Sequence, residues 1–102
     1  MHLIQLLLPL YSNDKQPLPK ELFIQVRAEL VERFGGLTAY TRAPASGLWQ
    51  EHDGQTTRDE LAIYEVMTEQ LDEAWWKRYR AELEGRFQQE ALVVRAQEVR
   101  ML

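Results

Sequence analysis

The chain has 102 residues, of which 45% are hydrophobic and 27% charged, a size and balance typical of one soluble globular domain rather than of a disordered or membrane-spanning chain. It contains no cysteine, which excludes disulfides, thiolate nucleophiles and cysteine-ligated metals. The formal net charge of −4, with arginines interleaved among acidic residues, argues against a nucleic-acid partner, because a phosphate-binding surface needs concentrated positive charge.

The first predicted element is an apolar strand from His2 to Leu10, interrupted by Gln5. Apolar residues on both of its faces predict a central strand that is covered on both sides. No lysine or arginine precedes the run and no small-residue cleavage site follows it, so it is not interpreted as a secretory signal. It is also too short to span a bilayer. We therefore expect no membrane partner and a cytoplasmic location.

The next predicted elements are a helix over residues 20–34 and a second strand over residues 37–43. Apolar residues recur in the helix at helical spacing, and Pro19 stands just before its first turn. Gly35 and Gly36 supply the left-handed stop. Along the strand, Leu37, Ala39, Thr41 and Ala43 alternate with Thr38, Tyr40 and Arg42. A loop of small residues then leads to Trp49.

A hairpin follows, since the pair Asp53-Gly54 is a strong turn signal between two extended segments. Its expected arms are residues 48–51 and 56–67. The later half of the second arm is rich in apolar and β-branched residues, so it is predicted to be a well-filled strand of the sheet.

A second helix is predicted over residues 68–89, and a closing strand over residues 90–102. Within this helix an apolar residue recurs every four positions: Leu71, Trp75, Tyr79, Leu83 and Phe87. Trp76 lies roughly 100° around the helix from Trp75. We expect these aromatic residues to belong to the core rather than to an aromatic binding site.

The order strand, helix, strand, strand, helix, strand predicts an α+β, ferredoxin-like βαββαβ sandwich in a single domain, residues 1–102. Its four-stranded antiparallel sheet has two helices on one face and its first and third strands in the middle. An extra hairpin arm is expected between the second and third strands.

The helix-free face of this sheet is expected to mix apolar side chains with polar ones. The alternation of each strand places Gln5, Arg42, Glu65 and Arg95 on that face, with Tyr40 beside Arg42. Such a face is too apolar to lie fully in water. It is either the interface of a homodimer, in which the charged residues form ion pairs, or the wall of a cavity that binds a small acid through Arg42 or Arg95. The two interpretations are compatible, because two such sheets that pack face to face can enclose a pocket between them.

The predicted ligand-binding residues are Tyr40, Arg42, Trp49, Glu65 and Arg95. The catalytic residues, if there are any, are not assigned. His52 is flanked by two acids that are adjacent in sequence, whereas metal ligands must converge from separate positions, so neither a metal site nor a cofactor is expected. The serines lie in predicted loops without a histidine partner, and no glycine-rich phosphate loop is present.

Three segments carry a family resemblance: ERFGGLTAY, GLWQEHDGQTTRDE and YRAELEGRFQQEALVV. Together they resemble a family of small, uncharacterised bacterial ferredoxin-like proteins, related to dimeric α/β-barrels. The matching residues are Arg33, Phe34, Gly36, Leu37, Thr38, Trp49, Gly54, Arg58, Asp59, Phe87, Gln89 and Glu90.

The resemblance implies a fold but brings no activity with it. It implies that Arg58, Asp59, Gln89 and Glu90, together with Trp49, form a recurrent cluster. Two features depart from the family pattern: Gln88 replaces a glycine, and the exported leader common among those proteins is missing.

Two functions are therefore considered. The first is a soluble dimeric module that binds a small molecule or a protein partner. The alternative is a small cofactor-independent enzyme, isomerase-like or oxygenase-like, with a pocket on the helix-free face of the sheet. The alternative depends on an analogy of fold, and this fold carries many functions.

Overall fold

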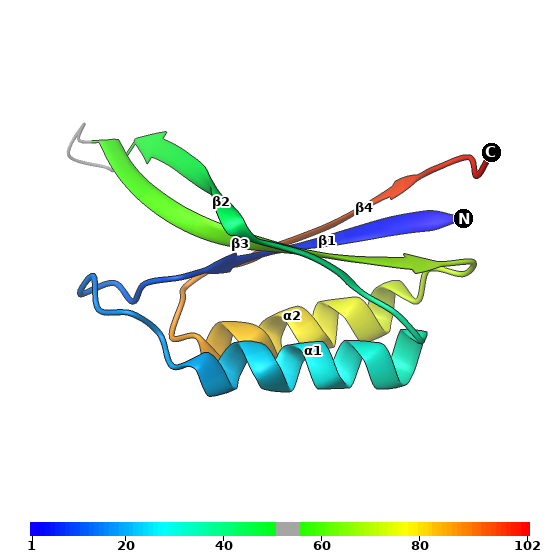
Figure 1. Cartoon of the computed structure of the whole chain (residues 1–102), viewed down its shortest axis with the longest axis horizontal. Coiled ribbons are helices and arrows are strands. Elements are labelled where there is room, and N and C mark those ends of the chain that lie inside the picture. The colour runs from blue at the N-terminus through cyan, green and yellow to red at the C-terminus, as the bar shows by residue number, and fades with distance from the viewer. Residues whose placement is uncertain (51–55) are drawn as a thin grey trace.

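The computed structural model describes the backbone of residues 1–50 and 56–102, with all of their side chains except those of residues 42–47, 49–50 and 56–59. Its elements are β1 (His2–Pro9), α1 (Lys20–Phe34), β2 (Thr38–Gln50), β3 (Thr56–Thr68), α2 (Glu73–Arg86) and β4 (Val93–Glu98). The strands form one antiparallel sheet in the order β2-β3-β1-β4, and both helices lie on the same face of it (Figure 1). The predicted ferredoxin-like fold is confirmed.

The core lies between the helices and the inner face of the two central strands. Strand β1 pairs with β3 on one side and with β4 on the other. Because successive side chains of a strand point to opposite faces, every second residue of β1, and of the part of β3 that pairs with it, faces the helices. These residues are at most 1% exposed: Ile4, Leu6, Leu8, Ala62, Tyr64 and Val66. The predicted division of the central strands into two faces is correct.

Each helix has a local stop or start signal. Helix α1 ends at Gly35, whose φ of 83° lies in the left-handed region and whose N–H donates to the Val31 carbonyl at 2.8 Å. Helix α2 begins after Asp72, whose side chain accepts a hydrogen bond from the Trp75 N–H at 3.0 Å. It is therefore shorter than the predicted helix over residues 68–89, since residues 68–71 precede the Asp72 cap and the helix ends at Arg86.

The buried face of α2 differs from the predicted one. Trp76 and Tyr79 are each only 6% exposed and Leu83 is fully buried, whereas Trp75 is half-buried. A helix has 3.6 residues per turn, so positions spaced by four drift around it, and the spacing from Trp76 to Tyr79 to Leu83 stays closer to one line. Trp75 instead lies at the margin of the core, stacked on Tyr79 with ring centroids 4.8 Å apart.

The second strand also differs from the prediction. Residues 38–50 form one strand, β2, in place of a strand, a loop and a separate hairpin arm. Its register against β3 shifts between Tyr40, opposite Ile63, and Ala45, opposite Leu61, so the expected loop is an irregularity within a continuous strand.

Beyond this shift, β2 and β3 extend as a two-stranded arm, because the pairing of β3 with β1 ends at Leu61 (Figure 1). The arm agrees with the predicted extra hairpin. Its predicted Asp53-Gly54 turn and His52 lie outside the described residues.

The helices leave part of β4 uncovered. Leu92, just before the strand, is buried, Val94 is half-buried and Ala96 is exposed. The alternation that places Arg95 on the helix-free face places all three on the side of the helices. The sheet twists, and in Figure 1 its edge strand β4 diverges from α2 toward the C-terminus. Within the described part of the chain, no helix is long and apolar enough to cross a membrane.

Candidate functional site

A chain of hydrogen bonds crosses all four strands on the helix-free face of the sheet. Arg95 Nε on β4 donates to Gln5 Oε1 on β1 at 2.8 Å, and Gln5 Nε2 donates to Glu65 Oε2 on β3 at 2.6 Å. Tyr40 Oη on β2 donates to the other carboxylate oxygen of Glu65 at 3.3 Å. The register explains this chain, because Gln5 lies directly opposite both Glu65 and Arg95. These four residues are called the polar ladder.

The polar ladder holds two opposite charges in fixed positions. Gln5 separates the guanidinium of Arg95 from the carboxylate of Glu65, and its amide accepts from one and donates to the other. Hydrogen bonds to charged groups are stronger than neutral ones and orient both partners. The Tyr40 side chain remains 49% exposed beside the carboxylate. The ladder thus presents oriented polar groups to whatever lies against this face.

Apolar side chains surround the polar ladder. Leu7 lies opposite both Ile63 and Val93, and Leu3 lies opposite Met67, all on the same face as Gln5. They are half-buried or exposed, with Val93 and Met67 among the exposed large hydrophobic residues. None of the described helices covers them (Figure 1). The expected mixed face, apolar with central polar groups, is therefore present.

The structure brings three of the predicted site residues together: Tyr40, Glu65 and Arg95. Gln5, which joins them, was placed on this face from the sequence but was not selected as a site residue. Its signal was the single polar side chain within an apolar strand. The side chains of Arg42 and Trp49 lie outside the described residues, so their predicted roles stay predictions.

The cluster implied by the family resemblance is described only in part. The side chains of Arg58 and Asp59 lie outside the described residues. Gln89 follows α2, where its N–H donates to the Glu84 carbonyl at 2.9 Å and its side chain donates to the Phe87 carbonyl at 3.1 Å. These hydrogen bonds close the end of the helix. Glu90 is exposed in the connection to β4.

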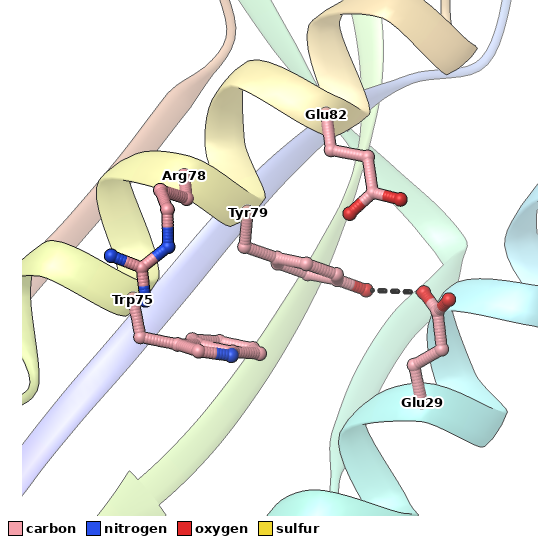
Figure 2. Close-up of a pocket in the computed structure, with 5 residues that line it drawn as sticks. All are labelled: Glu29, Trp75, Arg78, Tyr79 and Glu82. Carbon is pink, nitrogen blue, oxygen red and sulfur yellow. Dashed lines mark hydrogen bonds between the residues drawn. The ribbon is translucent and has the colours of Figure 1, made fainter.

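A second group of polar residues lies between the helices, on the outer side of the helical layer. A hollow of about 410 Å³ there is lined by Glu29, Trp75, Arg78, Tyr79 and Glu82 (Figure 2). Tyr79 donates from its hydroxyl to Glu29 at 2.8 Å. Local sequence spacing did not reveal this group, because Glu29 and Tyr79 are 50 positions apart and belong to different helices.

Arg86 ties the two helices together at this hollow. Its guanidinium donates to both carboxylate oxygens of Glu29, at 2.7 and 2.8 Å, and to Glu82 at 2.9 Å. The hydrogen bonds from Arg86 hold the pKa of Glu29 below its usual value, whereas burial and the Glu29 carboxylate raise the pKa of Tyr79. The charged groups of Glu29, Glu82 and Arg86 are paired with one another, and Tyr79 joins them through its hydroxyl. We call these four residues the helix clamp and interpret them as a link between the helices rather than as a ligand site.

The helix clamp predicts a pH dependence of stability. The pKa of Glu29 is lower in the folded state than in the unfolded chain, where the carboxyl has the ordinary value of a glutamate. The clamp therefore contributes its full stability above that value and loses it as the pH falls through the folded-state pKa. We expect Glu29→Gln to be less stable than the parent at pH 7 and to lose less stability between pH 6 and pH 3.

Urea unfolding at a series of pH values measures this effect as the difference between the two proteins. Glu32→Gln, an exposed acid on the same helix, serves as the control and is expected to follow the parent. If the free energy of unfolding fell equally with pH in Glu29→Gln and in the parent, the assignment of the helix clamp would be contradicted.

The observed topology and the open face define a class: a ferredoxin-like α+β protein with one sheet face free of helices. Among solved structures, the fold is similar to a phage SAM lyase in complex with S-methyl-5′-thioadenosine, with a TM-score of 0.64 and 19% identity over 95% of this chain and 80% of that one. It is also similar to a phage SAM lyase in the apo state, with a TM-score of 0.62 and 17% identity over 94% and 78%.

Neither a protein-family model nor a curated protein matches the sequence. At these identities the structural similarity concerns the fold alone. The resemblance to small bacterial ferredoxin-like proteins therefore stays a prediction.

Proposed function

We propose that this protein binds a small molecule on the helix-free face of its sheet and that a second copy of the chain covers that face. The observation that carries the proposal is the polar ladder, set among apolar side chains on an otherwise open surface. Ligand sites typically combine an apolar lining with a few polar groups whose positions are fixed. The ladder has this composition, and its hydrogen bonds supply the fixed positions.

Among the side chains that the structure describes, the polar ladder leaves hydrogen-bonding capacity unused at both of its charged residues. A carboxylate offers about four lone-pair sites, and the ladder occupies one on each oxygen of Glu65. The guanidinium of Arg95 donates one of its five N–H groups, to Gln5. A ligand with hydroxyl donors near Glu65 and an acceptor near Arg95 therefore complements this surface.

A thioether nucleoside is the ligand class that we propose. Carboxylates of proteins bind ribose hydroxyls, which assigns the sugar to Glu65. The half-exposed ring of Tyr40 and the neighbouring Ile63 offer a surface for the flat base. The fold similarity to a SAM lyase solved with S-methyl-5′-thioadenosine supports the choice of this class.

The proposal of a homodimer rests on the same face. Removing its apolar side chains from water stabilises a dimer. The two charged residues of the polar ladder, Glu65 and Arg95, have opposite signs, so they do not give the face a net charge that would repel a second copy. Two copies related by a two-fold axis can therefore cover this face together and enclose the ligand between their two sheets. In light scattering after size-exclusion chromatography we expect a dimer at micromolar concentrations. A monomer at every concentration would contradict this part of the proposal.

Binding is tested by isothermal titration of S-methyl-5′-thioadenosine into the parent protein and three variants. We expect saturable binding by the parent and at least a tenfold weaker affinity for Glu65→Gln, because a hydrogen bond to a charged group contributes about 1.5–3 kcal/mol. Tyr40→Phe is expected to weaken binding less, since it removes a neutral hydroxyl. Glu60→Gln, an exposed acid on the same strand, is the control. No binding by the parent, or equal loss in Glu60→Gln, would contradict the proposal.

A second candidate function is catalysis on the same face. It is supported by the fold similarity to a SAM lyase and by the phenol of Tyr40 placed against the carboxylate of Glu65. Incubation with SAM, followed by chromatography, tests it. Consumption of SAM by the parent but not by Glu65→Gln favours the enzyme. Persistence of SAM with intact binding of S-methyl-5′-thioadenosine favours the binding protein.

A further inference from the structure

A groove lies on the opposite side of the sheet from the polar ladder, between α2 and the edge strand β4. Its volume is about 330 Å³. It arises where the helix ceases to cover the inner face of β4, so that Val94 is half-buried and Ala96 is exposed. Arg95 borders both places, but the groove is otherwise lined by residues of α2 and of the inner side of the sheet, so its occupant does not depend on the function proposed for the helix-free face.

The floor of the groove is apolar. It consists of Ile4 and Trp76, which belong to the core, together with Leu71, Val94 and Ala96. Ala96 is small, which keeps the edge of the floor open between the strand and the helix. Apolar carbon placed here leaves water at a gain of about 25 cal/mol per Å². The floor therefore favours an aliphatic or aromatic body.

The rim of the groove carries more positive than negative charge. Lys77 and Arg80 lie one helical turn apart on α2, so both reach the same side of the helix, and Glu73 is the acid beside them. Arg80 has a loose ion pair with Glu84 at 3.9 Å, while the same oxygen of Glu84 accepts the Leu92 N–H at 3.0 Å. Arg95 also borders the groove, although its Nε donates to Gln5 on the other face.

We propose that this groove is a binding site for a small anion with an apolar body, of the class of alkyl carboxylates. The apolar body lies on the floor against Trp76, and the carboxylate faces Lys77 and Arg80 at the rim. Guanidinium and ammonium groups both bind carboxylates through charge-assisted hydrogen bonds. A cationic head group on the same body meets repulsion at this rim.

The head group provides the first test. Sodium decanoate and decyltrimethylammonium share the same alkyl chain and differ in charge, and both are titrated into the full chain below their micellar concentrations. We expect calorimetry to detect saturable binding of decanoate and binding at least tenfold weaker for the cation. Absence of decanoate binding, or equal binding of both, would overturn the proposal.

Matched variants provide the second test. Lys77→Glu reverses a rim charge, and Ala96→Trp fills the floor with an indole ring. Each is expected to weaken decanoate binding at least tenfold. Arg78→Glu is the control, because Arg78 lies on the same helix but lines the other hollow (Figure 2). Equal weakening by Arg78→Glu, or unchanged binding in both groove variants, would overturn the assignment of the site.

Discussion

Replacing Phe87 with alanine is expected to lower the free energy of unfolding by about 3–5 kcal/mol. The Phe87 ring is fully buried at the end of α2, and it packs edge-on against Phe23 of α1 with centroids 5.3 Å apart. Its removal leaves a cavity where the two helices meet the sheet. Domains of this size have total stabilities of about 5–15 kcal/mol, so the loss is a large part of the whole.

Urea unfolding followed by circular dichroism measures this loss. Phe23→Ala is the matched control: it removes the partner ring of the same pair, but Phe23 is half-buried, so a smaller loss is expected. A loss below about 1 kcal/mol in Phe87→Ala, or a larger loss in Phe23→Ala, would contradict the full burial of the Phe87 ring between the helices and the sheet.

Replacing Leu7 with glutamate is expected to convert the proposed dimer into a monomer. Leu7 lies at the centre of the helix-free face, opposite Ile63 and Val93. In the dimer its replacement would bury an unpaired carboxylate, at a cost of several kcal/mol, which raises the dissociation constant at least a hundredfold. In the separate chain this face is open to solvent, so the fold is expected to persist.

Light scattering gives the mass of this variant, and its far-ultraviolet spectrum reports whether the fold persists. Val31→Glu introduces the same charge at an exposed apolar residue on α1, so it is expected to remain dimeric. A dimeric Leu7→Glu protein would exclude the helix-free face as the interface. A monomeric Val31→Glu protein would indicate that the dimer interface lies on the helical layer instead.

Much of the sheet could be predicted because strand alternation is local information. The residues of β1 and β3 that face the helices were predicted correctly, and so were the positions of Gln5, Glu65 and Arg95 on the other face. Burial follows directly from this alternation once both helices lie on one side. The hydrogen bonds of the polar ladder then follow from register.

Other features depended on information that sequence spacing does not contain. The deeper burial of Trp76 than of Trp75 reflects the drift of a four-residue repeat around a helix. The partnership of Glu29 with Arg86 spans 57 positions and two helices. The exposure of Ala96 results from the path of α2 across a twisted sheet, which no local pattern in β4 encodes.

The helix-free face as the ligand-binding surface is tested most directly by methyl NMR. S-methyl-5′-thioadenosine is titrated into protein labelled at the methyl groups of isoleucine, leucine and valine. We predict saturable shifts for Leu3, Leu7, Ile63 and Val93 on this face, with Ile24 and Val31 on α1 unchanged. Shifts restricted to the helical residues, or no shifts at saturating ligand, would contradict the assignment.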